Sequence, residues 1–421
     1  MIIRPRRGKA FCLPEKWTLS FDGDFEITDG DGNVFASAFF GDGVAVSARF
    51  PYTSPFGGLR HVDYLTLSSE RKGKMSLCFG GARLALYAGD ELRDEEWPVG
   101  KPPSRLFLKN GSVGIISGCE LDEEHVKNGD DRIFSDVSSF RPEGTDSSCG
   151  DCMPFNDPRD GRYRLFFLYD RRHHGSKYGL GAHQWAQIST SDGVTWQTEP
   201  MAIGITKQWE GSICTGSVIE HDGIYYAYYA VRMCDGTPAK LTCARSTDCR
   251  HFEKSGRYFS LTAPYESVSA RDPKLFRTDD GIFHMLVTTS VGETGALAHL
   301  VSTDLETWEQ KEPFILAGRD VDQPECSDWF RIGNIYYLVF SLGGTARYRF
   351  SDNPTGPWTE PEDGGVIVDR TFRVPKAALL CGKTVFSGFV VDPGYGYGGH
   401  IELYEAKQHP DGTLGFSRYE K

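Results

Sequence analysis

A short mark recurs four times in the second half of the chain: an Asp followed a few positions later by a large aromatic residue. Successive Asp residues of these marks lie 56, 56 and 48 positions apart (248−192, 304−248, 352−304). A period of this length is typical of the blades of a β-propeller rather than of a helical repeat. The spacing therefore predicts repeated β-sheets arranged around a central axis. The four pairs are Asp192 with Trp196, Asp248 with Phe252, Asp304 with Trp308, and Asp352 with Trp358.

Each repeat also contains a stretch rich in aromatic and β-branched residues that follows a Gly turn. Runs of this composition between Asp-Gly or Gly-Asn signals predict hairpin-linked strands. Five such stretches predict an all-β chain in which residues 141–421 form a five-bladed β-propeller. The 421 residues and the 13% aromatic content supply ample material for its core. The stretches span residues 160–170, 222–232, 280–290, 333–342 and 382–391.

The first part of the chain lacks the repeat but still alternates as strands do. Residues 17–40 turn at Asp-Gly pairs, and residues 72–92 hold two candidate strands about a Gly-Gly turn. We therefore expect residues 1–140 to form an accessory β-sandwich-like domain that precedes the propeller. The polar stretch Glu120–Asp151 holds the expected boundary, with a short helix around Asp122–Lys127.

Charge and composition argue against several classes of partner. The net charge is −12, from 46 basic and 58 acidic residues, and no dense Lys/Arg cluster offers a phosphate-binding surface. No apolar run reaches the roughly eighteen residues of a membrane span, and no apolar leader segment opens the chain. We expect a cytoplasmic protein that binds neither nucleic acid nor membranes. Its oligomeric state is not indicated by the sequence.

Metal, redox and cofactor sites are not predicted. The eleven cysteines are scattered, which fits reduced thiols, and the close pair Cys149 and Cys152 has no second pair at matching spacing. His173 and His174 follow a hairpin strand and are interpreted as loop residues. The string Gly394–Gly399 fits a dinucleotide-binding pattern, but a strand pattern follows it where that site needs a helix.

A second set of marks, mostly polar residues before an apolar run, recurs with the blades. Their separations are 58, 57, 53 and 51 (215−157, 272−215, 325−272, 376−325), so the five positions are expected to ring one centre. Two acids at the beginnings of inner strands can face each other across the central funnel of a propeller. A pair of carboxyl groups is what glycoside hydrolysis needs. The marks are Asp157, Thr215, Asp272, Glu325 and Lys376.

The acidic marks lie in segments that resemble motifs of glycoside hydrolase family 32, the invertase, levanase and inulinase group. FNDPRDG resembles the family's Trp-Met-Asn-Asp-Pro-Asn-Gly, ARDPKLF its Arg-Asp-Pro block, and PECSDWF its Glu-Cys-Pro-Asp block. CTGSV and residues 185–196 look like its Ser-Gly-Ser and Trp-Gly-His-Ala…Trp segments. The resemblance covers about residues 141–421. Three motifs in the family order imply its five-bladed catalytic domain.

The resemblance implies a retaining glycoside hydrolase of β-fructofuranosides or related furanosides. Asp157 would be the nucleophile and Glu325 the acid/base. Asp272 would bind sugar hydroxyls through hydrogen bonds that strengthen in the transition state. Arg271, beside it in the sequence, would contact the substrate and keep a carboxylate ionised. The competing interpretation makes the Asp-Pro pairs at Asp157 and Asp272 turns that cap strands, and Glu325 a surface acid.

Further residues near the motifs are candidates for binding the substrate. Asn156, Thr215 and Trp185 belong to the motif segments themselves. Trp209 and Trp329 could form flat platforms on which an apolar sugar face stacks. The aromatic residues of the blade turns recur with the repeat and are predicted to pack between sheets instead.

Departures from the family pattern leave the substrate open. Pro154 and Phe155 replace the Trp before the first motif, Leu168 aligns with a family Gln, and Ser327 replaces the Pro of the third motif. The expected partner is a small oligosaccharide or glycoside. An arabinofuranosidase-type or inverting propeller glycosidase, a transglycosylase, and a carbohydrate-binding propeller without turnover remain as alternatives.

Overall fold

The protein is built almost entirely of β-strands. The computed structural model describes residues 3–50, 52, 65–118, 131–144, 146–319 and 322–420. In these ranges the one helix is the four-residue α1 (Ser176–Gly179). None of the described helical structure is long and apolar enough to cross a membrane. The short helix expected around Asp122–Lys127 lies outside the described residues.

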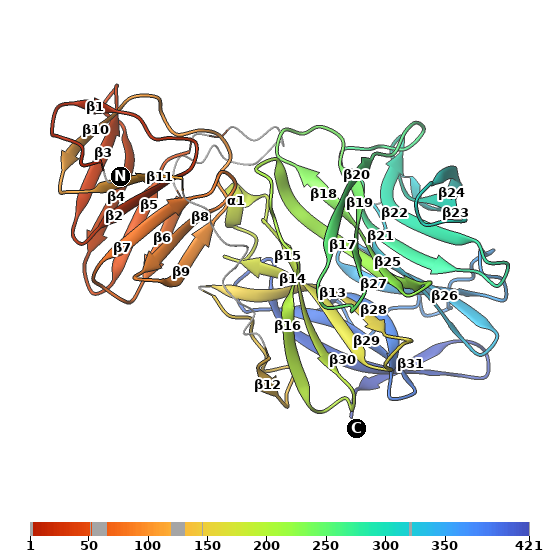
Figure 1. Ribbon diagram of the computed structural model, residues 1–421. Coiled ribbons are helices and arrows are strands. Elements are labelled where there is room, and N and C mark those ends of the chain that lie inside the picture. The colour runs from red at the N-terminus through yellow and green to blue at the C-terminus, as the bar shows by residue number, and fades with distance from the viewer. Residues whose placement is uncertain are drawn as a thin grey trace.

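Two antiparallel sheets form the N-terminal part of the chain, coloured red to orange in Figure 1. The first contains, in spatial order, β1 (Ala10–Phe11), β10 (Leu106–Asn110), β3 (Phe25–Asp29), β4 (Val34–Phe40), β5 (Val44–Ala48) and β6 (Leu65–Ser69). The second contains β11 (Gly114–Ser117), β2 (Trp17–Phe21), β7 (Met75–Phe79), β8 (Leu84–Ala88) and β9 (Glu91–Glu96). The strands predicted in residues 17–40 and 72–92 are thus confirmed.

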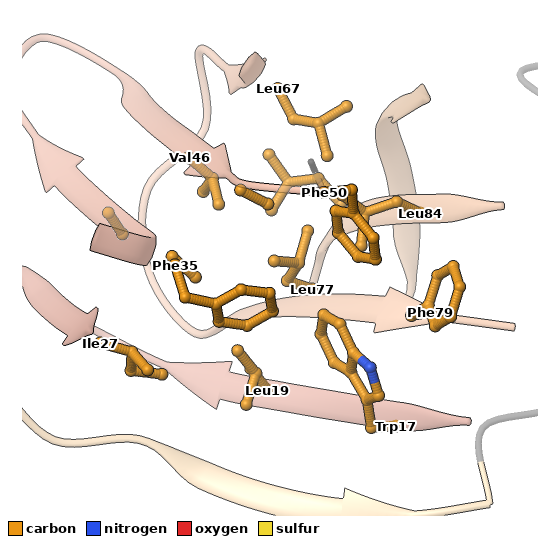
Figure 2. Close-up of a cluster of buried hydrophobic side chains, with 14 of the residues drawn as sticks. Trp17, Leu19, Ile27, Phe35, Val46, Phe50, Leu67, Leu77, Phe79 and Leu84 are labelled. Atoms are coloured by element: carbon orange, nitrogen blue, oxygen red, sulfur yellow. The ribbon is translucent and has the colours of Figure 1, made fainter. Parts of the chain in front are cut away.

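One apolar core is shared by these two sheets (Figure 2). The strand β2 alternates buried and half-buried side chains, which places Trp17 and Leu19 on its inner face. Phe35 of β4 meets the Trp17 ring edge to face, with the ring centroids 6.4 Å apart. Each large side chain buried in this way contributes on the order of 2 kcal/mol. The shared core therefore holds the two sheets together.

The strands after residue 146 follow one another as antiparallel meanders, shown from yellow to blue in Figure 1. The first has β13 (Ser147–Asn156), β14 (Tyr163–Arg171), β15 (Gln184–Thr190) and β16 (Trp196–Ile203), with β12 (Ile133–Phe134) paired to β16. The second has β17 (Glu210–His221), β18 (Ile224–Met233), β19 (Lys240–Ser246) and β20 (Glu253–Phe259). The third has β21 (Arg271–Arg277), β22 (Phe283–Val291), β23 (Thr294–Ser302) and β24 (Glu309–Arg319). Then come β25 (Glu325–Ile332), β26 (Ile335–Leu342) and β27 (Thr345–Ser351), and finally β28 (Phe372–Leu380), β29 (Lys383–Val391), β30 (Gly399–Gln408) and β31 (Leu414–Arg418).

The first strands of the meanders make a closed ring of contacts. β13 contacts β17, β17 contacts β21, β21 contacts β25, β25 contacts β28, and β28 returns to β13. The first and last meanders are also joined in one sheet through the pair Cys149 and Gly399. The aromatic stretches predicted from the sequence are the second strands, β14, β18, β22, β26 and β29.

Three of the four recurring Asp residues, Asp192, Asp248 and Asp304, form a repeated turn between the third and fourth strands of their meanders. Asp192 accepts hydrogen bonds from the backbone N–H groups of Val194 and Thr195, and Asp248 and Asp304 do the same in their own turns. The carboxylate thus satisfies backbone donors that the turn leaves unpaired. The aromatic residue that follows packs against a neighbouring hydrophobic cluster, as predicted.

A buried ionic contact fastens the N-terminal sheets to the ring. Asp94 of β9 is paired with Arg171 at the end of β14, and both side chains are buried. Arg171 also donates to the backbone carbonyl of Glu95 at 2.8 Å. Arg172 lies 3.3 Å from Asp94 and 3.1 Å from Glu96. Because these charges are removed from water, each depends on its partner.

Replacing Asp94 by Ala should therefore destabilise the protein strongly. The change removes the buried Asp94 carboxylate from its ion pair with Arg171, and breaking a buried pair by removing one partner costs about 3–5 kcal/mol. Thermal unfolding measures the effect. The matched control is Glu91→Ala, which removes an exposed acid of the same strand paired with Arg71 and should change Tm little. Equal losses in the two variants would contradict the assignment of this contact.

Candidate active site

A break in strand register recurs at the same place in every first strand of the ring. It lies between Cys149 and Cys152 in β13, Ile213 and Gly216 in β17, Arg271 and Lys274 in β21, Glu325 and Asp328 in β25, and Arg373 and Lys376 in β28. Such bulges leave residues out of the ladder and turn their side chains in new directions. The side chains released in this way meet at one end of the ring.

Three of these bulges hold a non-glycine residue in the left-handed region of backbone space. Asp272 has φ 59°, Cys326 has φ 51° and the β-branched Val374 has φ 39°. Each such conformation costs on the order of 1–3 kcal/mol and persists only where the surroundings fix it. Strain of this kind gathers at functional sites, which makes the bulged end of the ring the candidate active site.

A cavity of about 280 Å³ lies at this end. Three carboxyl groups, those of Asp151, Asp272 and Glu325, line it from three different meanders. The other polar residues that line it are His174, His183, Ser212, Thr215, Arg232, Arg271, Arg373 and Tyr397. Apolar atoms come from residues such as Leu168, Val374 and Phe389. A concave site with convergent polar groups is a candidate for binding or catalysis.

Asp151 accepts hydrogen bonds from three side chains. Thr215 donates its hydroxyl to Oδ2 at 2.7 Å, Tyr397 donates its hydroxyl to Oδ1 at 2.8 Å, and the Cys326 sulfur lies 3.3 Å from Oδ2. Burial raises the pKa of both Tyr397 and Cys326 well above their ordinary values, so both keep the proton that they donate. The Asp151 carboxylate is thus held in one orientation by neutral donors.

Asp272 and Glu325 are connected through Arg271. Its guanidinium lies 2.7 Å from Oε1 of Glu325 and 3.6 Å from Oδ2 of Asp272. Asp272 also accepts a hydrogen bond from the backbone N–H of Cys326 at 3.1 Å. Burial raises the pKa of Asp272, and the charge of Arg271 offsets part of that effect. Glu325 keeps about two fifths of its side chain exposed (41%), so it can reach both the cavity and solvent.

Asp157, the predicted nucleophile, is not in this cavity. It lies just beyond the end of β13, in the turn to β14, where it is fully buried. Its carboxylate is 2.8 Å from the Arg164 guanidinium and accepts the Tyr225 hydroxyl at 2.8 Å and the Arg159 backbone N–H at 3.0 Å. The prediction that Asp157 shares a cavity with Asp272 and Glu325 was wrong. The alternative interpretation, a turn that caps a strand, describes Asp157 correctly.

The spacing to the Gly turn was the signal that distinguishes Asp151 from Asp157. The marks in the second to fourth units precede their Gly turn by 8, 9 and 8 residues (223−215, 281−272, 333−325). Asp157 precedes Gly161 by only 4 (161−157), whereas Asp151 precedes it by 10 (161−151). A full first strand fits only after Asp151. The period between blades alone could not reveal this, because blade lengths vary by several residues.

Two of the six predicted substrate-binding residues line the cavity, namely Thr215 and Arg271. Trp185 lies just outside it, fully buried, and donates from Nε1 to the Cys214 carbonyl of β17 at 2.9 Å. Asn156 lies beside Asp157 and donates to the Leu379 carbonyl at 2.9 Å. Neither residue lines the cavity. Asn156 lies at the turn after the first strand and Trp185 in the hairpin core, and both places are away from the bulged end of the ring.

The two predicted tryptophan platforms also lie outside the cavity. Trp209 packs on Tyr258, with ring centroids 5.5 Å apart. Trp329 stacks on Phe276 at 4.2 Å and donates to the Pro354 carbonyl at 2.9 Å. Trp329 follows the β25 bulge, so its side chain turns between neighbouring sheets and packs there. Lys376, the fifth recurring mark, is buried and donates to the Gly216 carbonyl at 3.1 Å.

Two arginines of the cavity have no carboxylate partner among the described residues. Arg373 donates to the Gly344 carbonyl at 2.9 Å, and Arg232 lies in the wall that also contains His174. Arg232 also lines a second cavity of about 640 Å³, which borders the first. Leu168, which aligns with a Gln of the family, also lines the cavity. Cations without a counterion at the site favour an anionic ligand.

One group of residues beside the cavity has the donor set of a metal site, namely Asp170, His174 and His183. His174 and His183 line the cavity, and Asp170 is buried behind them. Burial and the neighbouring His183 lower the pKa of His174 to about 4, so its imidazole is neutral near pH 7. Sequence analysis assigned His174 to a loop, which the structure confirms, and did not single out His183 or Asp170.

Cys149 and Cys152 flank the bulge of β13. Both thiols are unpaired and buried, and burial raises the pKa of each well above its ordinary value. Thiols that stay protonated are poor nucleophiles and poor metal ligands. Their place in the strand gives them a packing role beside Asp151.

Known proteins match both the sequence and the fold. Residues 155–357 match the model of the "Glycosyl hydrolases family 32 N-terminal domain". This range includes Asp272 and Glu325 and begins four residues after Asp151 (155−151). A raffinose invertase of Escherichia coli is 29% identical over 213 residues, covering 46% of this chain and 43% of that protein. A sucrose-6-phosphate hydrolase of Bacillus subtilis (strain 168) is 27% identical over 244 residues, covering 50% of each.

Solved structures agree at the level of the fold. Fructan 1-exohydrolase IIa from Cichorium intybus superimposes with a TM-score of 0.54 at 16% identity, covering 66% of this chain and 59% of that one. A sucrose-6-phosphate hydrolase from Lactobacillus gasseri gives a TM-score of 0.53 at 18% identity, covering 65% and 61%. The chain spans about half or less of the length of the curated relatives named above. The chain is thus similar to glycoside hydrolase family 32, and it is a divergent, family 32-like protein.

The buried ion pair at the first turn predicts a structural effect for Asp157. Asp157→Ala should lower the stability of the protein by about 3–5 kcal/mol, because it strips Arg164 and Tyr225 of their buried acceptor. Denaturant unfolding measures the change. Asp160→Ala is the matched control, since Asp160 binds the other side of the same Arg164 from a largely exposed position. Comparable unfolding midpoints for the two variants would refute the structural role of Asp157.

Proposed function

We propose that the protein is a retaining glycoside hydrolase that cleaves β-fructofuranosides or related furanosides. The observation that carries the proposal is the meeting of Asp151, Asp272 and Glu325, from three separate meanders, at one cavity. A pure binding protein needs no such set of acids. We also propose that residues 141–421 form a five-bladed propeller and residues 1–140 an accessory sandwich. The ring of first strands and the shared N-terminal core support that division.

In this proposal Asp151 takes the role that sequence analysis gave to Asp157. Its carboxylate attacks the anomeric carbon and forms a covalent glycosyl-enzyme, while Glu325 gives a proton to the departing oxygen. Glu325 then takes a proton from water, whose oxygen attacks the same carbon and releases Asp151. The three donors around Asp151 fix its orientation for attack, which lowers the entropic part of the barrier.

Arg271 and Asp272 support this chemistry from the side. Arg271 holds Glu325 at 2.7 Å and so fixes the position of the acid/base. Asp272, which accepts a hydrogen bond from the Cys326 N–H, would accept further hydrogen bonds from sugar hydroxyls. Such bonds strengthen as positive charge develops on the sugar ring in the transition state. The strained φ of Asp272 is consistent with a residue held for function.

The substrate that we favour is a small fructoside carrying an anionic group such as a phosphate. Several relatives, including that of Bacillus subtilis, are named sucrose-6-phosphate hydrolases. Arg232 and Arg373, without carboxylate partners among the described residues, would pair with the anion. An arabinofuranosidase-type enzyme is the alternative, and a panel of sucrose, sucrose 6-phosphate, inulin, levan and aryl arabinofuranosides separates the two. We retain the proposal that the protein acts in the cytoplasm.

Asp151→Asn and Glu325→Gln should each lower kcat by at least about 10³-fold on the best substrate of the panel. The first change removes the nucleophile, and the second removes the proton donor. Rates are measured by release of reducing sugar, with folding checked by circular dichroism. Azide should restore turnover of Asp151→Asn and give a glycosyl azide of inverted configuration, because the small anion replaces the missing nucleophile.

Asp157→Asn is the control, measured at a temperature where the variant remains folded. Its kcat should stay within about threefold of the wild-type value, because Asp157 makes no contact with the transition state. Full activity of Asp151→Asn, or loss of activity in Asp157→Asn alone, would reject the assignment of the nucleophile. Activity on an arabinoside and none on a fructoside would reject the substrate.

Arg232→Gln and Arg373→Gln should raise the KM for sucrose 6-phosphate by about 10- to 100-fold, the range of one or two charge-assisted hydrogen bonds. The KM for sucrose should change little, because sucrose has no anionic group. Steady-state kinetics on both substrates measure the difference. The exposed Arg418, paired with Glu402, provides the control Arg418→Gln. Equal effects on the two substrates would reject an anion site at these arginines.

A further inference from the structure

We infer that Asp170, His174 and His183 bind a divalent first-row transition-metal ion of the zinc type beside the cavity. One ligand atom from each residue lies within 4.8 Å of the other two. His183 Nε2 is 2.9 Å from Asp170 Oδ1 and 3.3 Å from His174 Nδ1. The inference does not rest on the proposed hydrolysis, because the ligands and their geometry are independent of the three acids.

These distances fit a shared ion. Neighbouring ligand atoms about 2.0–2.1 Å from a tetrahedral zinc ion lie about 3.3 Å apart. The separation of His174 Nδ1 and His183 Nε2 has this value, that of His183 Nε2 and Asp170 Oδ1 is a few tenths of an ångström shorter, and all three atoms lie within 4.8 Å of one another. Two imidazoles and one carboxylate are also the donor set that zinc and similar ions prefer.

Protons alone satisfy this group poorly. His183 Nε2 faces both the Asp170 oxygen and the His174 nitrogen, yet it carries at most one hydrogen. With that hydrogen, a single donor is divided between two acceptors. Without it, the nitrogen lone pair faces a carboxylate oxygen. A cation accepts electron pairs from all three atoms at once and removes the conflict.

The surroundings hold the three ligands in place. Ser148 donates to Asp170 Oδ2 at 3.0 Å, and the His183 ring stacks on Tyr397 with centroids 4.9 Å apart. Outer contacts of this kind orient metal ligands. Gly181 fits closely against the imidazoles, since a Cβ there would lie 2.9 Å from His174 Nδ1 and 3.0 Å from His183 Cε1.

The backbone that carries these ligands is unusually strained. Six of the sixteen non-glycine residues with positive φ in the described chain lie within residues 172–182. Three of them are consecutive and end at His174, which has φ 70°. Each costs on the order of 1–3 kcal/mol and persists only where a ligand or packing fixes it. Metal coordination supplies a fixed point for this loop.

The site opens toward the cavity. Asp170 is buried, whereas His174 and His183 line the cavity wall, so the fourth coordination position faces the space where the substrate is proposed to bind. Water or a substrate oxygen would occupy it. Tyr397 connects the two sites, because its ring stacks on His183 and its hydroxyl donates to Asp151. The ion would therefore act as a positioning element for the Asp151 environment.

Zinc content tests the inference directly. The full chain is treated with a chelator, exposed to a zinc salt, and dialysed, and the zinc per chain is measured by plasma mass spectrometry. The wild type should retain one zinc ion, and zinc should raise its Tm. His174→Ala and Asp170→Asn should lose the ion or bind it at least about tenfold more weakly. His251→Ala is the control, since His251 is exposed and 2.8 Å from Asp248 without a second His ligand among the described residues.

Cobalt substitution covers the case in which a variant fails to fold. Cobalt bound to the wild type should give the visible bands of a four-coordinate site with nitrogen and oxygen ligands, and no thiolate charge-transfer band. Absence of retained zinc in the wild type, zinc retained equally by His174→Ala, or a cobalt spectrum of thiolate ligands would each overturn the inference. The thiolate result would assign the metal to the cysteines.

Discussion

The interruption of β-pairing in the first strands is the constraint on which the site depends. A regular ladder would turn alternate side chains toward the neighbouring sheets and leave a closed, uniform centre. The bulges release Asp151, Thr215, Asp272 and Cys326 from that pattern and turn them toward one another. The cost is local strain, seen as positive φ at Asp272 and Cys326. The extensive hydrogen bonding and apolar packing of the outer strands offset it.

The electrostatics of the site follow from this arrangement. Carboxyl groups drawn together in a small cavity repel one another, so each requires its own donors or cations. Asp151 has three neutral donors, whereas Asp272 and Glu325 share Arg271. Two differently held carboxylates at one cavity are suited to two different roles. The division between nucleophile and acid/base thus has a physical basis in their partners.

Sequence reasoning predicted much of the fold and part of the site. Repeat spacing and turn chemistry are local properties, so the second strands and the Asp turns could be located from residue patterns alone. Asp272 and Glu325 were found because each begins a strand. Asp151 was missed because a bulge leaves no trace in hydrophobic periodicity, and the Asn-Asp-Pro string at Asp157 imitated the expected motif. Tyr397 and Arg373 reach the cavity from loops and strands far along the chain, and no short pattern marks them.

The contacts between the first and last meanders, which close the ring, determine the order in which the protein matures. Asp151 lies in the bulge of β13, the first strand of the ring, whereas Tyr397, one of its donors, lies two residues before β30 in the last meander (399−397). The same closing strand joins the first sheet through Gly399. During synthesis the carboxylate is made some 246 residues before its partner. A nascent chain therefore carries Asp151 for most of its translation and all three acids once Glu325 is made, but gains an organised site only when its final meander has docked.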